Sequence, residues 1–161
     1  MEIKTNLREI CNVAIEKQDE NDAFVFFLRT YSAQDIDKIV YDLNEYIAPA
    51  VDCTQCGNCC KTLMIQVESQ EIDVLSSAMK VTQSQFEKMY IERGNSGIML
   101  INAMPCHFLS ENKCSVYEHR FSSCREFPAL HLPMFISRLF TTFMHYDRCP
   151  IIFNVIEALK K

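Results

Sequence analysis

The sequence has few glycines and prolines, and this scarcity excludes several familiar kinds of site. Only 3 glycines and 5 prolines occur among 161 residues. A phosphate-binding loop and a dinucleotide-binding fingerprint each need several closely spaced glycines, and neither pattern is present. Small secreted domains held by disulfides are usually rich in loops, which this composition does not favour. Nucleotide binding through these motifs is therefore excluded, and a disulfide scaffold is disfavoured.

Long apolar runs and basic clusters are lacking as well. No apolar stretch approaches the roughly 20 residues of a membrane span, and the start, MEIKTNLREICN, has no signal-peptide core. The net charge is -5, whereas nucleic-acid binding needs a basic patch. We therefore expect a cytoplasmic protein with neither membrane nor nucleic acid as a partner. Thiols in that compartment are kept reduced.

The hydrophobic periodicity predicts mainly helices. Apolar residues at three- and four-residue steps predict helices over 3–15 and 36–47. The apolar run at 23–28 is either a second helix or the continuation of the first. Ser32 is the expected cap of the helix at 36–47. Ser69 and Thr82 are the expected caps of two short helices, and Pro150 is expected to begin the C-terminal helix. Gly94–Gly97 is expected to end the helix that follows Thr82, where Gln85 completes a capping box.

Strand signals are short and few. Residues 62–67 and 98–101 are expected to be strands, and 110–113 is expected to be the turn of a hairpin, while 134–146 fits either a helix or a strand. We predict a mainly α fold, α with one or two short β hairpins, in a small cysteine-rich domain. The chain is expected to be a single domain, 1–161, with an N-terminal helical part at 1–50 and a cysteine-cluster part at 53–150.

Against this background stands CTQCGNCC, residues 53–60, in a chain of 9 cysteines. Thiolates packed this closely repel one another unless a cation lies among them, so the cluster indicates a metal site. Cys53, Cys56 and Cys59 form a C-x2-C-x2-C run, and Gly57 tolerates the positive φ that a tight curl needs. Bacterial ferredoxins bind iron–sulfur clusters with this run and a cysteine before proline. Cys149-Pro150 is a distant counterpart of that cysteine.

Zinc is the alternative metal. Structural zinc usually takes two C-x2-4-C pairs in a tetrahedron, and Cys53 with Cys56 would be one pair. The spacing does not say which of the remaining cysteines supply the second: Cys59, Cys60, Cys106, Cys114, Cys124 or Cys149. Cys60 either reaches a second metal or another edge of one cluster, or is simply buried. Cys11 lies on the apolar face of the first expected helix and is interpreted as a core residue.

Two polar groups have both a structural and a functional interpretation. His107, His119, His131 and His145 are either ligands or bases, or surface and satisfied core residues. Tyr117, Glu118, Arg120 and Arg125 lie between the cysteines. They either donate N–H groups that support sulfur ligands, or form a salt-bridged turn.

Together these motifs resemble a known family. CTQCGNCC, then PCHFL, CSVYEHR, CREFP and a later Cys-Pro are similar to the YkgJ-type cysteine-cluster family, the CxxCxxCC zinc- or iron-chelating domain proteins, over about residues 53–150. Phe121 departs from the family pattern, which usually has proline there. The resemblance implies eight candidate metal ligands: Cys53, Cys56, Cys59, Cys60, Cys106, Cys114, Cys124 and Cys149.

Three functions follow from these expectations. In the first, an iron–sulfur cluster or iron supports redox or electron-transfer chemistry with a redox partner protein. In the second, zinc holds the fold and an outer surface binds another protein. In the third, the chain is a metal-dependent enzyme, or an accessory protein related to the methylases that some longer relatives resemble. The sequence leaves open whether the protein is an enzyme.

Overall fold

The computed structural model describes residues 2–161 as two compact units. Unit 1 comprises the described residues through Asp52 together with Pro128–Lys161, and unit 2 comprises Cys53–Phe127. Helices predominate, and the strands form a three-stranded and a two-stranded antiparallel sheet, which confirms the predicted mainly α class. Residues 128–149 belong with the N-terminal helices. The expected single domain stays a prediction.

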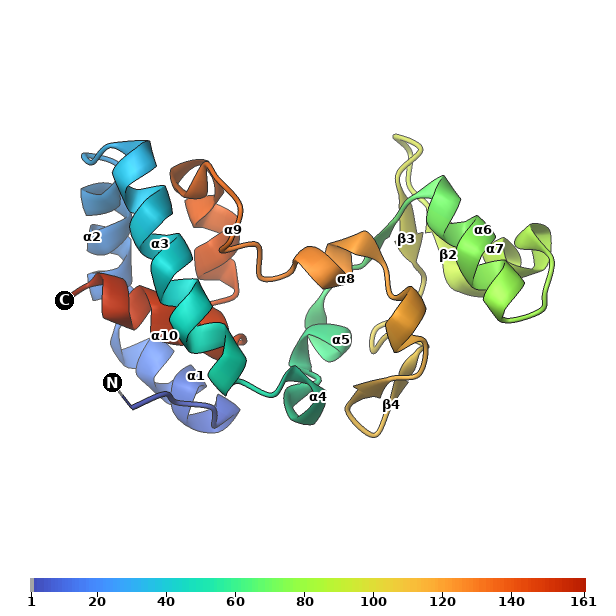
Figure 1. Cartoon of the computed structure of the whole chain (residues 1–161), viewed down its shortest axis with the longest axis horizontal. Helices are drawn as coiled ribbons and strands as arrows, with labels where there is room; N and C mark the ends of the chain where they lie inside the picture. Colours follow the sequence, from blue (N-terminus) through green and yellow to red (C-terminus); the bar gives the residue numbers. More distant parts are fainter. Residues whose placement is uncertain (1) are drawn as a thin grey trace. The chain divides into compact units, whose positions relative to one another are not determined.

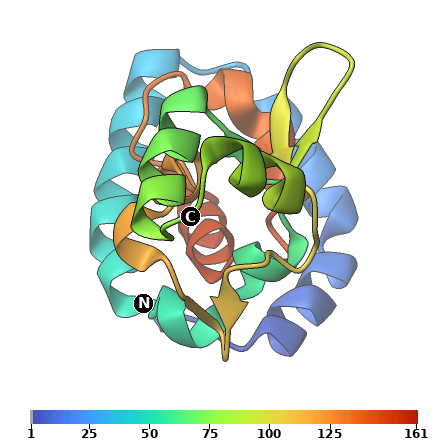
Figure 2. The same cartoon turned by 90° about the vertical axis from the view of Figure 1, so that its right-hand side faces the viewer.

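Unit 1 is a group of helices built around its C-terminal helix. Figures 1 and 2 show this helix, α10, in red, with α3 on one side of it and α1 and α2 on the other. The elements of unit 1 are α1 (Leu7–Glu16), α2 (Gln18–Leu28), α3 (Ala33–Ile47), the 3-10 helix η1 (Ala48–Ala50), the 3-10 helix η3 (Phe135–Arg138), α9 (Leu139–Met144) and α10 (Pro150–Leu159).

Helix α10 forms the centre of unit 1 because its sequence is apolar on almost every face. Residues Ile151 to Ile156 are all buried, as expected for a helix with no polar stripe. The buried Asn154 is the polar exception, and its amide group donates to the carbonyls of Lys4 and Pro150 at 2.7 Å each. Its side-chain oxygen accepts from the Lys4 backbone N–H. These bonds fix the N-terminal segment to α10.

Among residues 2–161, no helix combines the length and apolar character that a membrane crossing requires.

The sequence-based helices of unit 1 are confirmed with small shifts. Helix α1 starts at Leu7, where the Asn6 side chain accepts the N–H groups of Arg8 and Glu9. A single residue, Lys17, separates α1 from α2. Ser32 is the N-cap residue of α3, and Pro150 is the first residue of α10. The segment 134–146, which fitted either state, is helical as η3 and α9.

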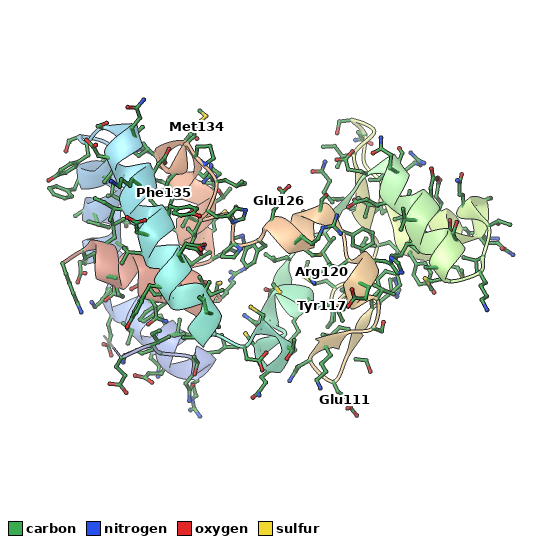
Figure 3. The ribbon with its side chains drawn as sticks, viewed as in Figure 1. Glu111, Tyr117, Arg120, Glu126, Met134 and Phe135 are labelled. Carbon is green, nitrogen blue, oxygen red and sulfur yellow. The ribbon has the colours of Figure 1, made fainter. Side chains whose placement is uncertain are left out.

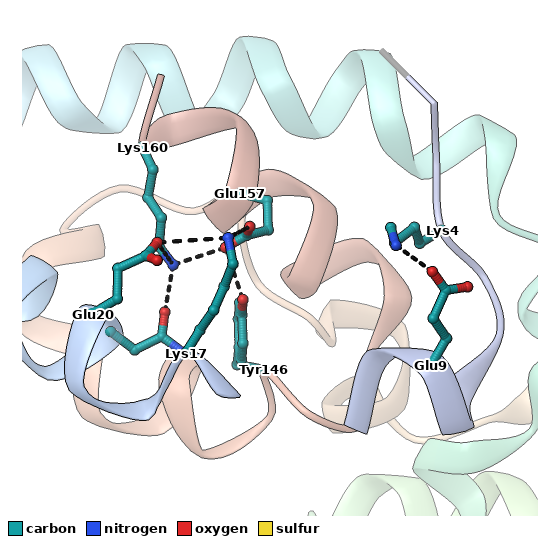
Figure 4. Close-up of polar contacts among 8 residues, drawn as sticks. Lys4, Glu9, Lys17, Glu20, Tyr146, Glu157 and Lys160 are labelled. Carbon is teal, nitrogen blue, oxygen red and sulfur yellow. Dashed lines mark hydrogen bonds and ion pairs between the residues drawn. The ribbon is translucent and has the colours of Figure 1, made fainter. Parts of the chain in front are cut away.

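A half-buried ion cluster joins α10 to the N-terminal helices (Figure 4). Tyr146 donates its hydroxyl to Glu157 at 2.7 Å, and Lys17 and Lys160 donate to the same carboxylate. Lys160 also donates to the buried Asn21 at 2.6 Å. Burial by itself would raise the pKa of Glu157, but the hydrogen bonds from Lys160, Lys17 and Tyr146 outweigh it and hold the pKa below its usual value.

Glu157 is therefore expected to make the stability of unit 1 depend on pH. A carboxylate whose pKa is lowered by folding contributes stability above its unfolded pKa, and the contribution is lost as pH falls through the folded pKa. Glu157→Gln should lower the free energy of unfolding at pH 7 by about 1–3 kcal/mol, because the cations lose their charged acceptor. Urea unfolding at pH 7 and at acid pH measures this. The loss should shrink on acidification.

The matched control is Glu9→Gln, which removes the more exposed carboxylate that pairs with Lys4. Exposed pairs contribute about 0–1 kcal/mol, so this variant should unfold like the parent protein at both pH values. Equal effects of the two substitutions would contradict a special role for the Glu157 cluster.

Unit 2 combines two helices of eight or more residues with two small sheets and a region of short helices that bears most of its cysteines. Its elements are α4 (Cys53–Cys56), α5 (Asn58–Thr62), β1 (Gln66–Val67), α6 (Ser69–Ala78), α7 (Gln83–Tyr90), β2 (Ile91–Arg93), β3 (Met99–Ile101), β4 (Leu109–Ser110), β5 (Lys113–Cys114), the 3-10 helix η2 (Tyr117–His119) and α8 (Ser122–Glu126). Strand β3 lies between β1 and β2, with Met99 opposite both Val67 and Arg93.

The predicted hairpin is confirmed as β4 and β5, with Leu109 opposite Cys114. Glu111 and Asn112 form its turn, and both have positive φ, which suits a two-residue turn between twisted strands. The capping box of Thr82 and Gln85 is also confirmed. Strand β3 begins one residue later than the expected strand at 98–101.

Three expectations for unit 2 are corrected by the structure. Ser69 is the first residue of α6, and the cap is Glu68, which forms a capping box with Glu71. The helix expected to run to Gly94 ends at Tyr90, because Ile91–Arg93 pairs with β3 instead. The expected strand at 62–67 is confined to its last two residues. Thr62 instead ends α5, where its hydroxyl donates to the Asn58 carbonyl at 2.9 Å.

The core of unit 2 extends from α6 and α7 to the cysteine region. Phe86 is fully buried, and its ring is stacked on Phe108 with centroids 6.3 Å apart. Phe108 in turn contacts Phe121, which is buried in this core. Phe121 is thus a packing residue at the position where the resembled family usually has proline. The same core includes Cys106, and Cys60, Cys114 and Cys124 pack against it.

Candidate metal centre

CTQCGNCC folds into two short helical turns that meet at Gly57. Gly57 has φ +57° and joins α4 to α5, which confirms the tight curl that the sequence predicted. A Cβ atom at this position would lie 2.9 Å from the Cα and carbonyl oxygen of Asn112. Glycine is therefore required here both by the left-handed backbone and by the close approach of the β4–β5 turn. This contact sets the cysteine run against the strand that carries Cys114.

Other contacts bring distant cysteines to the same run. The backbone N–H of Cys106 donates to the Cys60 carbonyl at 2.8 Å. Cys114 lies in β5, which contacts α4, and Cys124 lies in α8. Helix α8 is held to the unit 2 core from two directions: Ser122 donates its N–H to Glu71, and Ser123 donates its hydroxyl to the Gln66 carbonyl at 2.9 Å. Segments far apart in the sequence therefore surround Cys59 and Cys60.

Burial and neighbouring thiols shift the pKa of four cysteines in this region. A hydrogen bond between Cys59 and Cys60, together with burial, raises the pKa of Cys59. The same hydrogen bond lowers the pKa of Cys60, although burial acts in the opposite direction. Burial raises the pKa of Cys106, and the charges of Cys114 and Cys59 add to the effect. Burial and the charges of Cys106, Cys59 and Cys114 raise the pKa of Cys124 to about 12. We call Cys59, Cys60, Cys106, Cys114 and Cys124 the thiol group.

The thiol group has the donor chemistry of a soft-metal site. Its crowding and burial disfavour several thiolates at neutral pH, and a bound cation would remove that penalty. Sulfur donors select zinc, iron–sulfur clusters or copper(I) over hard, oxygen-preferring ions. Among residues 2–161, no three Cys, His, Asp or Glu side chains already converge at ligand distances, so the side chains would have to turn inward on binding. These five cysteines supply the donor atoms that a soft metal needs, and they lie in one region of unit 2.

A small cavity lies beside three members of the thiol group. Its volume is about 40 Å³, and Cys59, Cys60 and Cys124 line it together with the apolar Leu63, Met64, Ile65 and Phe127 and the Ser123 hydroxyl. The cavity is far below the several hundred Å³ of a pocket for a drug-sized molecule. The cavity leaves space next to the sulfur atoms, and its lining contains no charged side chain.

The remaining predicted ligands are placed differently. Cys53 is exposed and Cys56 half-buried, both in α4. Cys149 is buried in unit 1, where it caps α10. The participation of these three in the ligand set stays a prediction. Cys11 is half-buried in α1 of unit 1.

The polar cluster between the cysteines forms contacts within its own segment and with α6. The Arg120 guanidinium lies 3.9 Å from the centre of the Tyr117 ring. Figure 3 labels these two neighbouring side chains. The Arg125 guanidinium donates to the Arg120 carbonyl. Its Nη2 atom lies 4.0 Å from Oε1 of Glu71. These contacts favour the structural interpretation of Arg120 and Arg125. His107 is exposed and bonds Asn102 at 2.7 Å, as expected for a satisfied polar residue.

Sequence reasoning missed Asn112 and the apolar residues of the cavity. Asn112 is a turn residue with positive φ, and only the folded chain shows that its backbone excludes a side chain at Gly57. Leu63 and Phe127 looked like ordinary apolar residues, since nothing local marks the lining of a cavity. The signal that could have suggested Phe127 is its place next to Cys124 in the CREFP motif.

Comparison with known families adds to this geometry. The family model described as "CxxCxxCC: Putative zinc- or iron-chelating domain" matches residues 52–149. The chain belongs to this family. The CxxCxxCC match includes all eight cysteines predicted as ligands and leaves out Cys11. The family description supports metal binding in general. No curated protein and no solved structure matches the chain.

Proposed function

We propose that the protein holds an iron–sulfur cluster and acts in electron transfer or a related redox process. The observation that carries the proposal is the thiol group: five thiols from α5, the 102–114 region and α8 lie near one another in unit 2. One tetrahedral zinc ion takes four protein ligands, whereas adjacent Cys59 and Cys60 suit different edges of a larger centre. Cys53 and Cys56 of unit 2 are proposed to complete the ligand set, and a ligand role for Cys149 stays a prediction from the sequence.

The chain's own residues would bind the cluster and restrict its contact with water. The thiolates of the thiol group would hold it, and Leu63, Ile65 and Phe127 would shield the sulfur atoms on the cavity side. A bound cluster would supply one-electron chemistry, with a potential that depends on this burial and on hydrogen bonds to sulfur. The proposed partner is a redox protein. A reducing compartment such as the cytoplasm would keep the thiols available.

A structural zinc site is the second candidate. Unit 2 has strands of only two or three residues, and its cysteines lie in short helices, a short strand and a loop rather than in long elements. Small units with little regular structure often depend on a bound metal for stability. In this proposal zinc would hold the turns together, and a surface of the protein would bind another protein. The catalytic hypothesis stays a prediction from the sequence.

The experiment that tests the proposal is anaerobic purification followed by an absorption spectrum and analysis of iron, acid-labile sulfide and zinc in one sample. We expect a brown protein with a broad band near about 400 nm, from sulfur-to-iron charge transfer, and with iron and sulfide in comparable amounts. A colourless protein with stoichiometric zinc would overturn the redox proposal and support the structural one. A protein that takes up neither metal, even after anaerobic reconstitution, would contradict both.

A further inference from the structure

Helix α2 presents an exposed stripe with an aromatic centre and opposite charges at its ends. Asp22, Phe26 and Arg29 are four and three residues apart, so they lie on one face of the helix. All three are exposed, and Phe26 is 69% exposed. The opposite face carries the buried Asn21 and Leu28, which attach α2 to unit 1. The outward stripe therefore has no role in holding the helix to its own unit.

A second group of aromatic side chains lies on the neighbouring face of α2. Phe27, which is 52% exposed, lies next to Phe26, and its ring packs at 4.9 Å on Tyr31 and at 6.0 Å on Phe24. The Arg29 guanidinium lies 5.9 Å from the centre of the Phe26 ring. Single exposed apolar residues are ordinary, but several exposed aromatic residues on one helix, beside charged residues, are typical of a protein-binding surface.

The charges along α2 make the stripe complementary to the same stripe of a second copy in one orientation. Asp19 and Asp22 lie at its N-terminal end, and Arg29 follows its C-terminal end. When two such helices pack antiparallel, Asp22 of each lies opposite Arg29 of the other, and the two Phe26 rings meet at the centre. Parallel packing would place Asp22 against Asp22 and Arg29 against Arg29, which like-charge repulsion disfavours. A contact between identical surfaces about a two-fold axis has this self-complementary form.

We propose that α2 is the surface through which two copies of this chain associate about a two-fold axis. Phe26 and Phe27 would form the apolar centre of the interface, and the two pairs of Asp22 with Arg29 would set the antiparallel orientation. Both residues of each pair stay near solvent, so the pairs act mainly by excluding the wrong orientation. The interface involves one short helix, so the association is expected to be reversible, with a dissociation constant in the micromolar range. The proposal does not depend on the metal.

Sedimentation velocity of the full chain over a concentration series tests the proposal. We expect monomer at low concentration and dimer at high concentration. Phe26→Ser should raise the dissociation constant at least about tenfold, as for a central interface residue. The matched control is Phe140→Ser, which removes a phenylalanine that is 75% exposed on α9, and it should leave the constant unchanged. Circular dichroism and melting curves confirm that each variant is folded.

Charge exchange tests the orientation. Asp22→Arg and Arg29→Asp should each weaken self-association, because each places like charges opposite one another in the antiparallel pair. The double variant D22R/R29D should restore association, since arginine at 22 again faces aspartate at 29. Rescue is specific to antiparallel packing, because parallel packing would leave the double variant repulsive. A chain that stays monomeric at millimolar concentration, or a dimer unaffected by these exchanges and by Phe26→Ser, would overturn the proposal.

Discussion

Replacing Cys59, Cys60 or Cys124 with serine is expected to abolish most of the metal binding of this protein. These residues line one cavity and belong to the thiol group. A serine hydroxyl stays protonated and is a poor donor for a soft metal, whereas a cysteine is bound as the thiolate. Changing even the partners of metal ligands costs about 10–100-fold in affinity, so loss of a ligand should cost more than about 100-fold. Metal content after anaerobic reconstitution measures the effect.

The matched control is Cys11→Ser, which removes a half-buried thiol of unit 1. It should leave the metal content unchanged, and circular dichroism should show that every variant compared has kept its helices. Full metal content in all three cavity variants would place the metal elsewhere and contradict the site. Cys53→Ser, Cys56→Ser and Cys149→Ser, measured in the same way, decide whether those three cysteines complete the ligand set.

Gly57→Ala is expected to destabilise unit 2 by about 2–4 kcal/mol. Part of this cost is the left-handed backbone, which a residue with a Cβ adopts at about 1–2 kcal/mol. The remainder comes from the Cβ itself, which would lie 2.9 Å from backbone atoms of Asn112 and would force α4 and the β4–β5 turn apart. The free energy of unfolding in urea, followed in the apo protein, measures the total. Because the same movement separates Cys56 from Cys114, metal affinity should fall as well.

Gly97→Ala separates these two contributions. Gly97 has φ +79°, but a Cβ there would meet no atom within 4 Å. This variant should therefore show the backbone cost alone and should keep its metal affinity. If Gly57→Ala were no more destabilising than Gly97→Ala, the close packing of the cysteine run on the hairpin would be wrong.

Local sequence signals predicted a large part of the fold and the curl of the cysteine run. The capping box at Thr82, the positive φ at Gly57 and the proline at the start of α10 depend on neighbouring residues, so each was readable in the sequence. Strand β2 was missed because Ile91–Arg93 is extended only by pairing with β3. The cap at Glu68 was assigned one residue late, since Ser69 is also a good cap.

By itself, the sequence determined the helical character of the chain and its thiol chemistry. It also determined the curl at Gly57 within the short run that carries four cysteines. These properties follow from helical periodicity, donor atoms and one glycine. Only the tertiary structure decided that Cys106, Cys114 and Cys124 lie in the same region of unit 2 as Cys59 and Cys60. It also decided that a cavity lies beside Cys124, and that α2 turns its aromatic stripe outward. The physical reason is that these arrangements depend on packing between distant segments, such as the hydrogen bond from Cys106 to Cys60, which no local pattern encodes.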